Sequence, residues 1–147
     1  MVQFFHSTFD ALTKQQLYDM LRLRSEVFVV EQECIWLDVD GHDDHAIHVW
    51  GEEDGKIVAV ARFFKAGDYY EEATLGRVAV NPAHRKTGTG RALMEYTLNT
   101  MRELHGAAPI KIMAQAYLQK FYGSYGFNAI GDAFDDCGIM HYYMIRK

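Results

Sequence analysis

LGRVAVNPAHRKTGTGRALMEYTL, residues 75–98, is the stretch that most strongly decides the fold of this chain. Residues 75–80 are rich in β-branched side chains and predict a strand, which the pair Asn81–Pro82 ends. The loop His84–Gly90 follows and runs directly into a predicted helix. The apolar face of that helix is formed by Leu93, Met94, Leu98, Met101 and Leu104. The stretch therefore predicts a strand, a glycine-containing loop and an amphipathic helix in direct succession.

The loop before this helix has the chemistry of an anion-binding site. The first backbone N–H groups of a helix have no internal partner, and the helix dipole favours negative charge there. Gly88 and Gly90 would let a pyrophosphate approach the backbone, while Arg85 and Lys86 would add charge-assisted hydrogen bonds. The alternative is an ordinary helix start with basic surface residues. A Walker loop is excluded because no Lys-Ser or Lys-Thr pair follows the last glycine. A dinucleotide fingerprint is excluded by the glycine spacing and by the downstream acid.

Outward from this stretch, the chain predicts an α+β (mixed α/β) fold. A capping box at Thr13 and Gln16 begins a helix that continues to Phe28, with Arg24 on its apolar face. We expect Arg24 to pair with a carboxylate or to reach the helix edge, with a ligand role as the alternative. Further strands are predicted at residues 46–50, 57–64, 109–114, 127–130 and 139–145, with a short helix at 117–125 and an acidic loop at 132–136.

These elements predict a central mixed, mostly antiparallel sheet with helices on both faces. The strands on either side of the helix 88–104 should be parallel, with a right-handed crossover. The length of 147 residues, of which 49% are hydrophobic, fits a single domain, 1–147.

Composition excludes several classes of protein. The formal charge of −5 gives no basic footprint for nucleic acid. The N-terminal segment lacks the basic and apolar regions of a signal peptide, and no apolar run reaches membrane-spanning length. Cys34 and Cys137 are far apart in sequence and predict neither a metal-type pair nor a disulfide framework, so a reducing cytoplasm is the expected location.

Acidic residues are concentrated between positions 31 and 44. This concentration predicts either a solvated acidic loop or a patch that attracts a cationic substrate. The residues concerned are Glu31, Glu33, Asp38, Asp40, Asp43 and Asp44. Nearby, His42, His45 and His48 invite a metal interpretation, but the segment is predicted to be a loop entering a strand, where their spacing would not group them. We therefore expect no metal site.

Several motifs together resemble the GNAT family of N-acetyltransferases. Residues 85–90 match the coenzyme A loop of that family, R/Q-x-x-G-x-G/A, and Val78–Pro82 match the strand before it. Residues 121–127, FYGSYGF, resemble the family ending F-Y-x-x-x-G-F. Residues 21–32, 38–41 and 136–141 are similar to the ElaA-type branch of the family. The resemblance covers nearly the whole chain.

The resemblance implies that acetyl-CoA is a co-substrate and that a primary amine attacks its thioester directly in a ternary complex. The amine would belong to a small molecule or to an exposed amino group of a protein. The strand backbone would pair with the pantetheine arm, and one of its N–H groups would polarise the thioester carbonyl. The residues implied to contact coenzyme A are Val78, Ala79, Val80, Arg85, Lys86, Thr87, Gly88, Thr89, Gly90, Arg91, Gln115 and Tyr122.

Tyr122 aligns with the family tyrosine that protonates the leaving thiolate. A tyrosine suits this role because its ordinary pKa, about 10, lies not far above that of a thiol. Tyr117 and Tyr125 are competing donors, and a purely structural aromatic is the other interpretation of Tyr122.

Two departures from the family pattern bear on the chemistry. Gln115 stands where many members carry asparagine, and the strand near Gly76 lacks the glutamate that often serves as the base. Glu33 and His84 are the predicted base candidates, with Glu31, His48, His141 and bulk solvent as alternatives. Acceptor contacts are predicted from Arg24, Phe28, Glu31 and Glu33. The competing functions are a non-catalytic coenzyme A sensor or interaction module and, more remotely, a metal-binding protein, and the sheet edges allow a homodimer.

Overall fold

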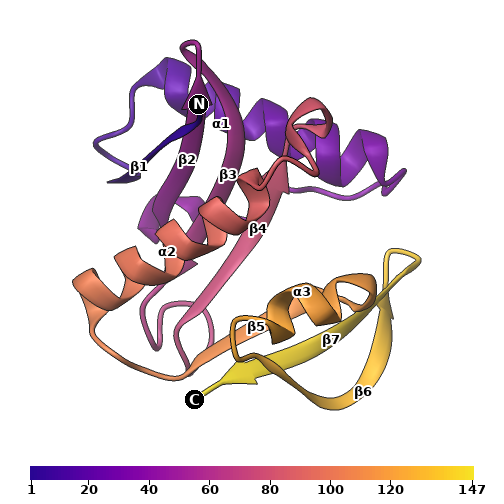
Figure 1. Cartoon of the computed structure of the whole chain (residues 1–147). Coiled ribbons are helices and arrows are strands. Elements are labelled where there is room, and N and C mark those ends of the chain that lie inside the picture. The colour runs from indigo at the N-terminus through magenta and orange to yellow at the C-terminus, as the bar shows by residue number, and fades with distance from the viewer.

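The computed structural model describes residues 1–147, and its helices and strands follow one another in an α+β order (Figure 1). Short 3-10 turns occur at η2 (Asp43–His45), η3 (Pro82–His84) and η4 (Ala116–Leu118), and η1 (Ser25–Glu31) is a π-helical continuation of α1. The regular elements are β1 (Gln3–Thr8), α1 (Lys14–Arg24), β2 (Ile47–Glu53), β3 (Lys56–Phe64), β4 (Thr74–Val80), α2 (Thr89–His105), β5 (Ile110–Gln115), α3 (Gln119–Gly123), β6 (Asn128–Asp136) and β7 (Ile139–Arg146).

The strands form two antiparallel sheets that meet at one parallel bridge. One sheet has the order β1-β2-β3-β4 and the other has the order β5-β7-β6. The bridge pairs Ala73 with Ile110, immediately before β4 and at the start of β5. Figure 1 shows β4 and β5 diverging beyond this point. The parallel arrangement predicted for these strands is therefore confined to their first residues, and the rest of β4 has a free edge.

A β-bulge bends β4 at the place where it diverges. Arg62 pairs with Gly76 and Val60 pairs with Ala79, so two residues of β4 lie opposite one residue of β3. Arg77, the first residue of the bulge, has φ of 50°, a conformation that non-glycine residues rarely adopt. The bulge interrupts the regular pairing and changes the direction in which the following backbone groups point.

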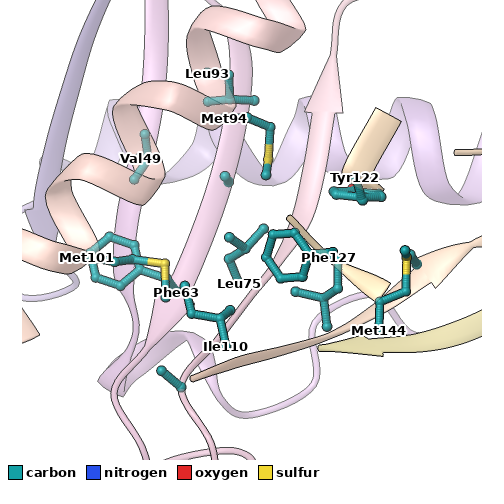
Figure 2. Close-up of a cluster of buried hydrophobic side chains, with 14 of the residues drawn as sticks. Val49, Phe63, Leu75, Leu93, Met94, Met101, Ile110, Tyr122, Phe127 and Met144 are labelled. Carbon is teal, nitrogen blue, oxygen red and sulfur yellow. The ribbon is translucent and has the colours of Figure 1, made fainter. Parts of the chain in front are cut away.

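Helices cover both faces of the first sheet, as the sequence predicts. The capping box is present: the Thr13 side chain accepts from Gln16 N–H, and the Gln16 side chain accepts from Thr13 N–H. Helix α1 packs its buried side chains against Trp50 and Val60, and α2 packs on the opposite face. Figure 2 shows Leu93, Met94 and Met101 of α2 over Phe63 and Leu75. The same core continues to Ile112, Phe127 and Met144 of the second sheet.

Two strands differ from the prediction. Strand β1 was not predicted, and it pairs antiparallel with β2 from Gln3–Glu52 to Thr8–Ile47. Strand β6 continues to Asp136 through the segment predicted to be an acidic loop, after an irregularity between Ile130 and Phe134. The ring of Phe134 stacks on Tyr143 of β7 with centroids 4.9 Å apart, which helps to hold the extension in the sheet.

Half of the acidic residues in the stretch 31–44 form an ion-pair network with arginines, namely Asp38, Asp40 and Asp43. Glu31, Glu33 and Asp44 are exposed, as expected for a solvated loop. Arg24 is 3% exposed and donates to Asp38 at 2.8 Å and to Asp43 at 2.8 Å. Arg62 is equally buried and donates to Asp43 at 2.8 Å and to Asp40 at 2.6 Å. The prediction of Arg24 as a substrate contact is therefore wrong, and its carboxylate-pairing alternative is correct.

The network also holds the bulge. Arg77 Nη2 donates to the carbonyl of Asp38 at 3.0 Å. Arg77 Nε lies 2.8 Å from Asp38 Oδ1, an ion pair without hydrogen-bond alignment. The guanidinium also lies over the ring of Trp36, 4.6 Å from its centroid. These contacts offset the backbone strain at Arg77 and fix the position of β4.

Among the helices, none is both long enough and apolar enough to cross a membrane.

Candidate active site

A cavity of about 610 Å³ occupies the space where β4 and β5 diverge. Its walls come from η1, from the bulged part of β4 and the loop that follows it, from β5 and α3, and from the ends of β6 and β7. Most of its lining is hydrophobic, and its charged groups come from η1, β4, the loop before α2 and the ends of β6 and β7. A cavity of this shape, apolar with a few convergent polar groups, is typical of a small-molecule site.

The loop before α2 presents unpaired backbone donors. None of the backbone N–H groups of residues 86–91 donates to an acceptor in the protein, and the first helical pairing is Ala92 N–H to Gly88 O at 3.0 Å. Lys86 and Gly88 have φ of 63° and 85°, so the backbone turns through the left-handed region twice before the helix begins. Consecutive amides in such a turn form a concave donor surface for an anion.

Gly90 leaves room for a ligand next to these donors. It lines the cavity, and a Cβ placed on it would have only Val80 Cγ2 nearby, at 4.0 Å. The space beside Gly90 is therefore open on the side that faces the cavity. The free amides, the open space and the basic residues Arg85 and Lys86 fit the pyrophosphate of coenzyme A.

Most of the residues predicted to contact coenzyme A line this cavity, and some do not. Those in the lining are Val78, Ala79, Val80, Arg85, Lys86, Gly90, Gln115 and Tyr122. Thr87 and Arg91 are outside the lining. The Thr87 hydroxyl donates to the His84 carbonyl, and the Arg91 guanidinium lies 5.8 Å from the Tyr125 ring centroid. Gly88 and Thr89 are outside the lining, so only their backbone amides are available to an anion.

The free edge of β4 turns backbone groups toward the cavity. Asn81 N–H donates to Val58 O of β3 at 2.8 Å, and alternation along the strand directs the groups of Val80 to the other side. The Val80 carbonyl accepts there from Arg85 Nε at 3.0 Å. The edge thus offers main-chain pairing to an extended ligand, as the resemblance implies for pantetheine.

Arg85 and Glu31 form an ion pair across the mouth of the cavity. Both guanidinium Nη atoms donate to the carboxylate, at 2.6 Å and 2.8 Å. The hydrogen bonds from Arg85 lower the pKa of Glu31, with its positive charge adding to the effect and partial burial opposing it. Glu31 therefore stays ionised, and it is neutralised by Arg85 rather than free to receive a substrate amine. Phe28 also lines the cavity, so two of the predicted acceptor contacts lie at the site.

Tyr122 lines the cavity and keeps its proton at neutral pH. It is a buried residue of α3 that packs in the hydrophobic cluster of Figure 2 and lines the cavity, and its hydroxyl makes no hydrogen bond within the protein. Burial raises the pKa of Tyr122, with a smaller contribution from Tyr117, so the phenol keeps its proton at neutral pH. Of the competing donors, Tyr125 donates to the Arg91 carbonyl at 3.3 Å and lies outside the lining, while Tyr117 is 74% exposed at the mouth.

The two base candidates selected from the sequence lie outside the cavity. Glu33 is exposed with φ of 51° and does not reach the lining. His84 Nε2 lies 3.6 Å from Glu53 on a different face. Both assignments are corrected by the geometry, because the loop after η1 and the turn η3 point these side chains away. His141, which the sequence offered as an alternative base, does line the cavity, as does Asp136, which was not among the candidates.

A disulfide joins Cys34 to Cys137, contrary to the expectation from the sequence. Their Cα atoms are 5.9 Å apart although 103 residues separate them in the chain. The bond links the segment after η1 to the β6–β7 turn, and both cysteines line the cavity. It therefore connects two walls of the candidate site, an arrangement that only the folded chain reveals.

The histidines between positions 42 and 48 do not converge on one point: His42 contacts His45, whereas His48 has a different partner. His42 Nδ1 and His45 Nε2 are 3.3 Å apart, while His48 Nε2 donates to the Asp43 carbonyl at 2.8 Å. No group of three potential metal ligands is close enough to hold an ion. Burial lowers the pKa of His48, which leaves it a neutral structural donor.

The chain is similar to known proteins along nearly its whole length. Residues 10–147 match the family model described as an acetyltransferase (GNAT) domain. Protein ElaA of Escherichia coli K12 is 40% identical over 139 residues, 92% of this chain and 90% of that protein. Its crystal structure is similar with a TM-score of 0.93 over 100% of both chains. An acyl-CoA N-acyltransferase from Pseudomonas aeruginosa is 35% identical, with a TM-score of 0.95 and 100% coverage of both chains.

Proposed function

Because this chain belongs to the GNAT acetyltransferase family, we propose that it transfers an acyl group, most simply acetyl, from acyl-CoA to a primary amine. The observation that carries the proposal is one cavity lined by three features: unpaired amides at the start of α2, the free edge of β4 and the unpartnered hydroxyl of Tyr122. When bound, acyl-CoA would supply a thioester whose carbonyl carbon is open to attack by an amine.

Each of these features has a separate role in the proposed reaction. The amides of residues 86–91 bind the pyrophosphate, and the β4 edge near Val80 orients the pantetheine arm. A β4 backbone N–H supplies the oxyanion stabilisation that acyl transfer requires. Tyr122 donates its proton to the departing sulfur, so that a neutral thiol leaves. The apolar lining excludes water and so limits hydrolysis of the thioester.

The acceptor we propose is a cationic primary amine, on a small molecule or on the surface of a protein. The sequence suggested a cationic acceptor because of the acidic stretch, but the carboxylates at 38, 40 and 43 pair with arginines and are not available to a substrate. A different carboxylate supports the proposal. Asp136 is the cavity carboxylate that has no ion pair or hydrogen bond within the protein. It is available to attract an ammonium group to the cavity. A homodimer stays a prediction, as does a cytoplasmic location, for which the Cys34–Cys137 disulfide removes the argument from unpaired cysteines.

Calorimetric titration with acetyl-CoA, followed by an assay of thiol release over a panel of amines, tests the proposal. We expect saturable binding and amine-dependent release of thiol. Tyr122→Phe should retain acetyl-CoA binding and lose activity by about 100-fold or more, the usual range for a positioned proton donor. Unchanged turnover in this variant would remove Tyr122 from the mechanism.

A non-catalytic coenzyme A sensor is the second candidate function. It is favoured by the absence of a carboxylate at Gly76 and by the pairing of Glu31 with Arg85, which leave no glutamate free in the cavity. A sensor would bind acetyl-CoA and release no thiol with any amine, so the same two measurements separate the candidates.

A further inference from the structure

His141 is the imidazole that the fold places in the wall of the cavity. It is 7% exposed on β7, where its register partners are Gln115 of β5 and Phe134 of β6. Residues paired across antiparallel strands project to the same face, and Gln115 lines the cavity as well. The Phe134 ring stacks on the imidazole with an interplanar angle of 25°. The side chain is thus held in one orientation by its neighbours.

The hydrogen bond at Nδ1 decides which ring nitrogen is free. His141 Nδ1 lies 2.7 Å from the carbonyl oxygen of Ile139. A carbonyl can only accept, so Nδ1 carries the proton and the neutral ring has its lone pair on Nε2. Nε2 has no partner in the protein, yet it is not enclosed, so it is accessible from the cavity. An imidazole in this state is ready to accept a proton from a ligand.

We propose that Nε2 of His141 takes the proton from the acceptor ammonium in the acyl transfer described above, on which this inference rests. The neutral amine then forms the C–N bond at the thioester carbonyl as the C–S bond breaks. Tyr122 gives its proton to the sulfur. The second N–H proton, lost as the amide forms, restores the phenol, and His141 releases the first proton to solvent. One proton leaves overall, and no oxidant or metal is required.

Other charged groups around the cavity do not fill this role. Arg85 and Glu31 pair with each other, Arg77 pairs with Asp38, and Tyr122 is held protonated by burial. The titratable groups that face His141 across the cavity or from adjoining elements are Glu31, Arg77, Arg85, Lys86, Tyr117, Tyr122 and Asp136. Of these, Asp136 is exposed and has no ion-pair partner, so its role is to attract the ammonium group. His141 then removes the proton from that ammonium group.

The variant His141→Asn tests the assignment while preserving the hydrogen bond to Ile139, because the asparagine amide can donate where Nδ1 does. Rates of thiol release are measured with alkylamines such as methylamine and putrescine, and with hydroxylamine, which is already neutral at pH 7.5. We expect a loss of about 100-fold with alkylamines and little change with hydroxylamine. Acetyl-CoA binding and the melting temperature should be unchanged.

Three outcomes would overturn the inference. Equal losses with alkylamines and hydroxylamine would indicate a structural role for the side chain. Full activity in His141→Asn, or a loss found instead in His84→Asn, would place the base elsewhere. If the native protein binds acetyl-CoA but releases no thiol with any amine, the proposed function itself is overturned. This outcome differs from failure of the His141 assignment because it is seen in the native protein, without any variant.

Discussion

Replacing Asp43 by asparagine should sharply destabilise the fold. Asp43 accepts from Arg24 Nη1 and from Arg62 Nη1, both at 2.8 Å, and each arginine side chain is 3% exposed. An asparagine has nearly the same shape but leaves two buried guanidinium groups without their shared counter-charge. Removing one member of a buried ion pair costs about 3–5 kcal/mol, which corresponds to a drop in melting temperature of roughly 10 °C or more for a chain of this size.

Urea unfolding followed by circular dichroism measures this loss, with the midpoint expected to fall and the slope to stay constant. The matched control is Glu26→Gln, which breaks a surface pair between side chains that are 47% and 70% exposed. That pair should contribute less than about 1 kcal/mol. The reasoning is refuted if Asp43→Asn costs no more than the control, because the buried network would then contribute nothing beyond packing.

Gly90→Ala should remain folded, since its Cβ meets nothing closer than 4.0 Å, but should weaken acetyl-CoA binding in calorimetry at least tenfold; Gly123→Ala, also with open space but outside the cavity, should bind normally. Reducing the Cys34–Cys137 disulfide should lower the free energy of unfolding by about 3–5 kcal/mol, the range for a closed loop of about 100 residues; an unchanged urea midpoint in dithiothreitol would contradict this. Stability should also fall in acid. Burial alone would raise the pKa values of Asp40 and Asp43, but their arginine partners hold both below the ordinary value, so the stabilisation is complete above about pH 4 and is lost as the pH falls further. Unfolding measured from pH 6 to pH 2 checks the sign.

The parts of the fold that local pattern determines could be predicted from the sequence. The strand, glycine loop and helix at residues 75–98 depend on β-branched residues, a proline and helical periodicity, all close together in the chain. Tyr122 could be selected by its spacing from Gly126 in the family ending. The structure adds that Tyr122 lines the cavity while the hydroxyl of Tyr125 donates to the Arg91 carbonyl.

The features that the sequence did not predict depend on contacts between distant segments. Strand β1 is a short edge strand whose residues are mostly exposed, so it lacks a strong alternating pattern. Three carboxylates of the acidic stretch became part of an ion-pair network because arginines from α1, β3 and β4 converge on them. His141 could have been favoured by its place in the alternating segment 139–145, but its tautomer depends on the turn that brings the Ile139 carbonyl to Nδ1.

The bond between Cys34 and Cys137 also determines whether the two fragments separate after a single proteolytic cut. It closes a ring of chain that contains every strand from β2 to β6 and the loop that precedes α2. One cut by a protease anywhere inside that ring leaves both pieces covalently joined, with the cavity walls still attached to each other. Such a nicked chain would migrate as a single band on a denaturing gel until a reductant separates it into two fragments.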